Sequence, residues 1–153
     1  MSRRARFRER LEEAALVHVA ARPVAAHLVG RERYVELTRL LFGFLEEEGV
    51  RAQTSALTLY QVLAEPYRRG RGEEARRVGD HLEAVRGLQT VPVSAELARQ
   101  AARVRARLGG RTERAVQIAT ALEAGADLFL DLDSGLRRIA EMEVLDLEDY
   151  SGS

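Results

Sequence analysis

Short apolar runs typical of strands alternate with amphipathic segments typical of helices along nearly the whole chain. We expect strands at residues 16–19, 50–54, 88–93, 127–130 and 143–147. The spacing of apolar residues predicts helices over residues 3–15, 31–48, 57–69, 71–86, 95–108, 112–124 and 133–140. Strands that alternate with helices form a parallel sheet, because each parallel connection must cross over a face of the sheet. The chain is therefore predicted to be an α/β protein.

The length of 153 residues suits one compact domain. We expect residues 1–15 to form a basic N-terminal helical extension, residues 16–147 to form the domain, and residues 148–153 to form a frayed C-terminal tail. Ser55 and Ser94 stand where two of the helices are expected to begin, and serine is a favoured N-cap residue.

The balance of charge excludes a generally basic surface as the basis of any binding to nucleic acid. The 24 basic residues, all of them arginine, match 24 acidic residues, so the formal net charge is +0. Any contact with nucleic acid must come from a local patch. The chain has no Cys, which excludes disulfides and thiolate metal sites. No apolar run is long enough to span a bilayer and no hydrophobic region follows the basic N-terminus, so we expect a cytoplasmic protein without membrane contact.

Active sites of open parallel sheets lie beyond the carboxyl ends of the strands. This rule directs attention to the residues after Val19, after Thr54, around Thr112 and after Leu130.

The segments at those four points resemble the motifs of PIN domains, and of VapC-type toxin ribonucleases in particular. Residues 17–22 (VHVAAR) resemble the first motif and residues 54–63 (TSALTLYQVL) the second. Residues 111–122 (RTERAVQIATAL) resemble the third, and residues 125–133 (GADLFLDLD) the fourth. The resemblance covers about residues 16–147. It implies a PIN-like three-layer α/β/α fold around a central parallel sheet of about five strands.

In the PIN family, acidic residues at the carboxyl edge of the sheet hold Mg²⁺ or Mn²⁺, which polarises the phosphate and prepares a water molecule for attack. The matching positions here are Ala20, Gln61, Arg114 and Asp133, with Asp131 as a neighbour. The formal charges of the four positions sum to zero, because Asp133 is negative and Arg114 positive. The resemblance therefore implies a remnant site, for which we expect no metal and no cofactor.

Arg114 suggests what replaces the cation. We hypothesise that its guanidinium pairs with Asp131 and Asp133. Arg22, Arg111 and Arg114 are the candidate residues for nucleic-acid binding. Denser arginine clusters at residues 3–10, 68–77 and 99–111 are either solvated helix faces or tracks for a phosphate backbone.

Three functions stay open at this point. We favour a PIN-family protein that lacks nuclease activity and binds RNA or a protein partner. The first alternative is a weak endoribonuclease that depends on Mg²⁺ or Mn²⁺, held by Asp131, Asp133 and Glu113, with Glu65 as a further carboxylate. The second alternative is a structural or decoy subunit that dimerises or binds an antitoxin. We expect a homodimer, and the aromatic and apolar residues that could form either its interface or the core are Tyr34, Leu41, Phe42 and Phe44.

Overall fold

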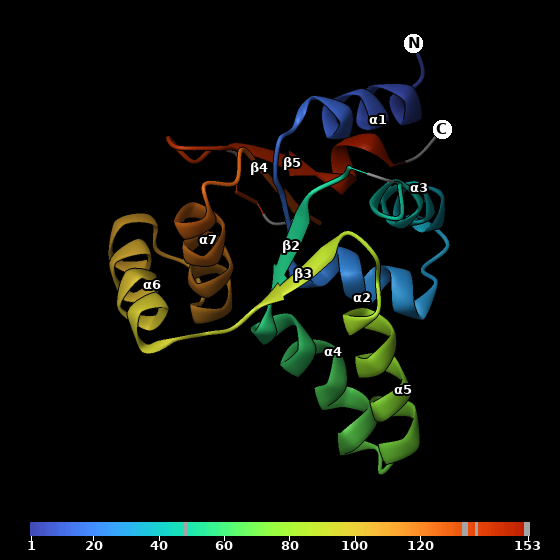
Figure 1. The fold of residues 1–153 in the computed structure, drawn as a ribbon, viewed down its shortest axis with the longest axis vertical. Helices are drawn as coiled ribbons and strands as arrows, with labels where there is room; N and C mark the ends of the chain where they lie inside the picture. Colours follow the sequence, from blue (N-terminus) through green and yellow to red (C-terminus); the bar gives the residue numbers. More distant parts are fainter. Residues whose placement is uncertain (48, 133–134, 137, 152–153) are drawn as a thin grey trace.

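The computed structural model describes residues 1–47, 49–132, 135–136 and 138–151. Over these residues the chain forms one parallel sheet with the strand order β3-β2-β1-β4-β5 (Figure 1). The strands are β1 (Val17–Val19), β2 (Ala52–Ser55), β3 (Leu88–Val91), β4 (Leu128–Asp131) and β5 (Glu143–Asp146). The predicted fold class is confirmed.

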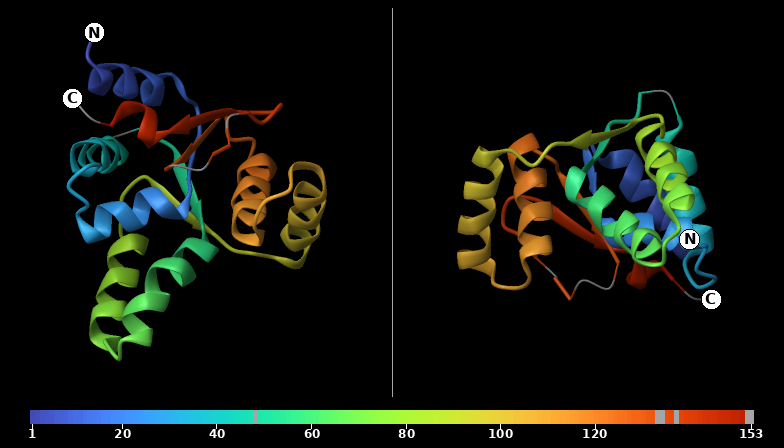
Figure 2. Two further views of the ribbon diagram at one scale, coloured as in Figure 1. Left: turned by 180° about the vertical axis from the view of Figure 1, so that it is seen from behind. Right: turned by 90° about the horizontal axis from the view of Figure 1, so that it is seen from below.

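Helices cover both faces of the sheet (Figures 1 and 2). They are α1 (Arg3–Glu13), α2 (Ala21–Val29), α3 (Val35–Leu45), α4 (Ala56–Arg68), α5 (Gly72–Glu83), α6 (Ala95–Leu108) and α7 (Thr112–Ala124). Successive residues of a strand point to opposite faces. Val17 and Val19 of β1 therefore pack in the core formed with α1, α2 and α3, whereas Phe129 of β4 packs in the core formed with α6 and α7.

Helices α4 and α5 form a hairpin that extends away from the sheet (Figure 1). Ser55 caps α4 by accepting a hydrogen bond from the amide of Leu57, and Ser94 caps α6 in the same way, as the sequence predicts. Thr58 is the one buried side chain of α4 among the described residues.

Three internal segments differ from the prediction. Helix α2 was not expected, because its N-cap, Ala20, has no side chain that can cap a helix. Pro23 lies in its first turn, where proline is tolerated. Helix α3 begins at Val35 and not at residue 31. Residues 135, 136 and 138–140 are not helical. The left-handed backbone of Gly135, with φ at +70°, is incompatible with the helix predicted over residues 133–140.

Both ends of the described chain are packed. Phe7 and Leu11 of α1 are fully buried, and Phe7 meets Tyr150 with ring centroids 5.5 Å apart. Residues Leu147–Tyr150 form a 3₁₀ helix, although the last strand was expected to reach residue 147 and a frayed tail to begin at residue 148. Arg3 donates a hydrogen bond of 2.7 Å to the carbonyl of Ser151 and so joins the two ends.

The apolar stripe around α3 belongs to the core. Tyr34, Leu41, Phe42 and Phe44 are all buried within the chain itself, so the interpretation of these side chains as a partner surface is wrong. Helix α1 packs against α3. None of the described helices has the length and apolar character needed to cross a membrane.

Candidate functional site

A pocket of about 280 Å³ lies at the carboxyl edge of β1 and β4. Most of the described residues that the sequence indicated for the site line this pocket: Ala20, Arg22, Gln61, Arg111, Glu113, Arg114 and Asp131. Asp133 lies outside the described residues, as does its expected ion pair with Arg114.

Four chain segments bring these side chains together. Strand β1 ends at Val19 and leads directly into α2, which places Arg22 in the first turn of that helix. Gln61 lies on α4, and Asp131 is the last residue of β4. Between α6 and α7, Gly110 has a positive φ of +84°, and a Cβ atom there would lie 3.4 Å from Nη1 of Arg114. The Arg114 side chain therefore passes close over this turn.

Two helices begin at the pocket without a side-chain cap. The N-cap of α2 is Ala20 and that of α7 is Arg111, and neither side chain accepts a hydrogen bond from the first turn. The first amide groups of a helix carry partial positive charge and have no partner within the helix. Both helix ends therefore favour a negative group in this pocket.

Asp131 is the most perturbed acid of the pocket. Its side chain is 7% exposed, and burial raises its pKa to about 6. The amide of Leu132, which donates to Oδ1 at 2.7 Å, and the charges of Arg22 and Arg114 oppose this rise. The negative charge of Asp146 adds to it.

The described lining carries more positive than negative charge. Three guanidinium groups, of Arg22, Arg111 and Arg114, face two carboxylates, of Glu113 and Asp131, so the formal sum is +1. Hard divalent cations need several carboxylate oxygens. Over residues 1–47, 49–132, 135–136 and 138–151, no group of three or more His, Cys, Asp or Glu side chains could hold a metal ion. The described residues therefore do not fit the divalent cation that the PIN resemblance implies.

Glu65 does not complete an acidic site. Its side chain is half exposed and bonds to Arg68 at 2.6 Å and to Arg69 at 2.8 Å, on the surface of α4. It is not part of the pocket lining, so its suggested role as a metal ligand is wrong for this arrangement.

Asp146 is a buried acid next to the site that the sequence did not indicate, although it does not line the pocket itself. It is 5% exposed and stands in register with Asp131 on the neighbouring strand. Its side chain also accepts a hydrogen bond of 2.9 Å from the amide of Glu148. The rule that sites lie beyond strand ends, applied to the last strand as well, would have found it.

A buried chain of hydrogen bonds runs beneath the pocket and was also missed. His18 is fully buried, and burial lowers its pKa to about 4. The Gln53 amide donates to Nδ1 of His18 at 3.0 Å, and Nε2 of His18 donates to the Gln117 side-chain oxygen at 2.8 Å. These partners require the neutral ring with its proton on Nε2.

The chain continues from Gln117 to the end of β1. The Gln117 amide donates to the hydroxyl of Thr58 at 2.9 Å, and Thr58 donates to Thr54 at 2.8 Å. Thr54 then donates to the carbonyl of Val19 at 2.6 Å. Because His18, Gln117, Thr58 and Thr54 each both donate and accept, the chain ties β1, β2, α4 and α7 together directly below the pocket.

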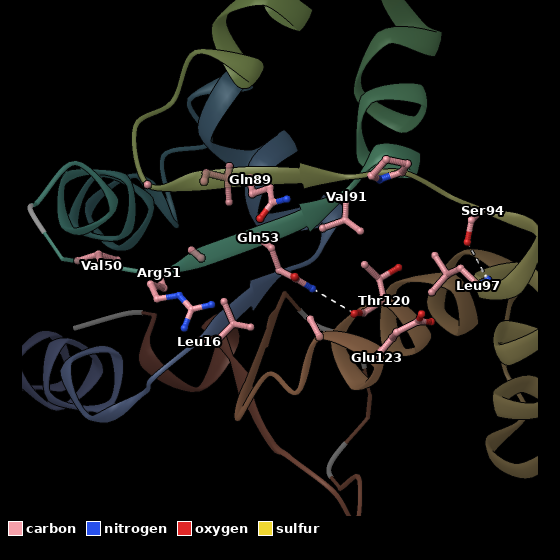
Figure 3. Close-up of a pocket in the computed structure, with 15 residues that line it drawn as sticks. Leu16, Val50, Arg51, Gln53, Gln89, Val91, Ser94, Leu97, Thr120 and Glu123 are labelled. Atoms are coloured by element: carbon pink, nitrogen blue, oxygen red, sulfur yellow. Dashed lines mark hydrogen bonds between the residues drawn. The ribbon is translucent and has the colours of Figure 1, made fainter.

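A larger pocket of about 650 Å³ opens between β2, β3 and the end of α7 (Figure 3). Gln53 donates a hydrogen bond of 3.2 Å to the carbonyl of Thr120 at its wall (Figure 3). Arg51 and Glu123 are its charged residues and have opposite signs. This pocket gathers no set of charges, so the smaller pocket is the candidate site.

A family model for the PIN domain matches residues 36–142, which is well over half of the chain. The chain belongs to the PIN-domain family. This family membership agrees with the motifs found in the sequence and with the parallel sheet of the structure. A comparison with curated proteins finds no match.

Solved structures show the same fold. Mycobacterium tuberculosis VapC20, a toxin that cleaves the sarcin–ricin loop, is similar with a TM-score of 0.60 and 18% identity over 74% of this chain and 86% of that one. VapBC2 from Rickettsia felis, bound to a promoter DNA fragment, has a TM-score of 0.62 and 12% identity over 85% and 98%. A Klebsiella pneumoniae toxin–antitoxin complex has a TM-score of 0.61 and 13% identity over 86% and 97%. At these identities the similarity establishes the shared fold.

Proposed function

We propose that this PIN domain binds RNA at the pocket between β1, β4 and α7, and that it does so without metal-dependent cleavage. The observation that carries the proposal is the convergence of Arg22, Arg111 and Arg114 on a pocket with only two carboxylates among its described residues. In the family this place holds a cation that meets the phosphate. Here guanidinium groups supply positive charge at the same place.

The chemistry of the pocket suits a phosphodiester. Arginine presents a planar fork of donors that matches two phosphate oxygens. The uncapped starts of α2 and α7 add backbone amides that favour an anion. Because the formal net charge of the chain is +0, binding should depend on this local patch and not on a general attraction.

Replacing Arg111 with glutamate should weaken RNA binding by about ten-fold or more at low salt, because a phosphate contact becomes a repulsion. Arg111 is exposed, so the fold should tolerate the change. Fluorescence anisotropy of an unstructured RNA oligonucleotide in the presence of EDTA measures the effect. Arg76→Glu is the matched control, because Arg76 is exposed on α5 and does not line the pocket. Equal affinities of the two variants would contradict the proposal.

A metal-dependent endoribonuclease is the second candidate. The observation in its favour is the pair of buried carboxylates, Asp131 and Asp146, at adjacent strand ends. Together with Asp133 they would form a reduced acidic set. This candidate requires RNA cleavage that needs Mg²⁺ or Mn²⁺, stops with chelator and disappears in Asp133→Ala.

A structural or decoy subunit is the third candidate. Tyr60 and Tyr67 of α4 are 69% and 58% exposed. Large exposed side chains on one helix are candidates for contact with a partner protein. One of the similar structures is a toxin–antitoxin complex. Size-exclusion chromatography for a homodimer and a pull-down for an antitoxin-like partner distinguish this candidate from an RNA binder.

A further inference from the structure

We infer that a single RNA strand crosses two adjoining pockets, with a phosphate in the candidate site and the neighbouring base against Arg31. The inference rests on the proposed function, because the first phosphate is the one that Arg111 and Arg114 hold.

The second pocket has a volume of about 430 Å³ and lies beside α2. Arg22 lines both pockets. It lies in the first turn of α2, and its guanidinium donates to the carbonyl of Leu132, which also lines the second pocket, at 3.3 Å. The side chain is thereby held at the boundary. A cation at the boundary of two pockets is suited to a backbone phosphate that passes from one to the other.

Arg31 provides a flat surface in the second pocket. Its guanidinium carbon lies 5.2 Å from the ring centroid of Tyr34, whose buried ring supports it from below. The hydroxyl of Tyr34 bonds to Glu148, which fixes the ring. Arg33 also lies over this ring, at 5.8 Å, but Glu148 neutralises it. Among the described residues, no salt bridge involves Arg31.

A guanidinium plane supported by an aromatic ring is a surface on which a base can stack. Val29, which is 78% exposed and also lines the second pocket, adds apolar area beside it. The first pocket, at about 280 Å³, is small for a whole nucleotide and suits a phosphate group. Two pockets of these kinds match the alternation of phosphate and base along one strand.

Single-stranded RNA is the chemistry that fits this surface. A base can reach a stacking surface only when it is not stacked within a duplex. The second pocket should therefore distinguish an unpaired strand from a helix, whereas the phosphate pocket alone should not.

Arg31→Ala should weaken binding of an unstructured 12-nucleotide RNA about five-fold, the effect expected for one lost stacking contact. It should leave binding of ribose 5-phosphate within about two-fold, because a sugar phosphate without a base needs the first pocket alone. Arg111→Glu should weaken the binding of both ligands. Anisotropy, with competition by ribose 5-phosphate and by the 12-mer annealed to its complement, measures all three. Arg76→Ala is the control for loss of one exposed positive charge.

Equal 12-mer affinities of Arg31→Ala and Arg76→Ala would overturn the two-pocket path. If Arg111→Glu still weakens RNA binding, the proposed function stands without the two-pocket path. If Arg111→Glu has no effect, both the path and the proposed function are contradicted. If Arg31→Ala lowers the affinity for the duplex as much as the affinity for the single strand, the inference is also overturned, because base stacking would not then be the source of the affinity.

Discussion

Replacing Gly87 with alanine should destabilise the folded protein by about 3 kcal/mol or more, because the added methyl group would overlap a carbonyl oxygen. Gly87 precedes β3 and has a φ of +81°. A Cβ atom built on it lies 2.1 Å from the carbonyl oxygen of Leu45. The carbonyl of Gly87 accepts a hydrogen bond of 3.1 Å from Ala52, so the loop cannot move away without disturbing β2.

Gly30→Ala is the matched control. Gly30 has nearly the same backbone, with φ at +72°, but nothing lies within 4 Å of the position of its Cβ atom. Gly30→Ala should lower the free energy of unfolding by only about 1 kcal/mol, which is the cost of holding alanine in the left-handed region. Urea unfolding of both variants measures the difference. Equal losses of unfolding free energy in the two variants would mean that the Gly87 loop does not approach α3 closely.

Asp131→Asn should make the protein more stable above pH 6 by about 2 kcal/mol, and should have little effect near pH 4. The pKa of Asp131 is raised to about 6, so its contribution to stability is present at low pH and is lost as the pH rises through 6. Asparagine removes the cost of the buried charge and can still accept from the amide of Leu132. The charged groups that act on Asp131 from the neighbouring elements are Arg22, Arg114 and Asp146.

His18 has the opposite effect on the pH dependence. Its pKa is lowered to about 4, so the folded state is stable above pH 6.5 and loses stability as the pH falls toward 4. Between pH 4 and 6 the two groups oppose each other in the wild type. The difference in unfolding free energy between Asp131→Asn and wild type should therefore rise from pH 4 to pH 8. Urea unfolding at each pH measures it, and a difference independent of pH would show that Asp131 is not buried as described.

The strands could be predicted from the sequence because they alternate with amphipathic helical segments, although β2 (Ala52–Ser55) and β3 (Leu88–Val91) are not continuous apolar runs. The position of the candidate site could also be predicted, because the carboxyl ends of parallel strands meet at one edge of the sheet. Ala20, Gln61, Arg114 and Asp131 do line one pocket.

The hydrogen-bond chain beneath the pocket could not be predicted in this way. His18 and Gln117 are 99 residues apart, and no periodic pattern links them. Their contact depends on how α7 packs over β1, which is a matter of side-chain fit. Helix α2 was missed because Ala20 carries no capping signal, and a helix over residues 133–140 was predicted because nothing in the pattern reveals the left-handed backbone of Gly135.

The arginine clusters on α4 and α5 follow the plainer of their two interpretations. Arg68 and Arg69 bond to Glu65, and Arg76 bonds to Glu73, all within one helix and on the surface. Such exposed ion pairs between neighbouring turns are typical of a solvated helix face. The arginines of α4 and α5 therefore do not belong to the proposed RNA site.

The proposed replacement of the family's cation by arginine is tested most directly by calorimetric titration of Mn²⁺ into the wild-type protein, alongside RNA binding measured in EDTA. A variant with Ala20→Asp, Gln61→Glu and Arg114→Asp restores the acidic positions and serves as the positive control. We predict that the wild type binds RNA in EDTA and takes up no Mn²⁺ at micromolar concentrations, whereas the variant binds Mn²⁺. Micromolar binding of Mn²⁺ by the wild type that disappears in Asp133→Ala would contradict this prediction.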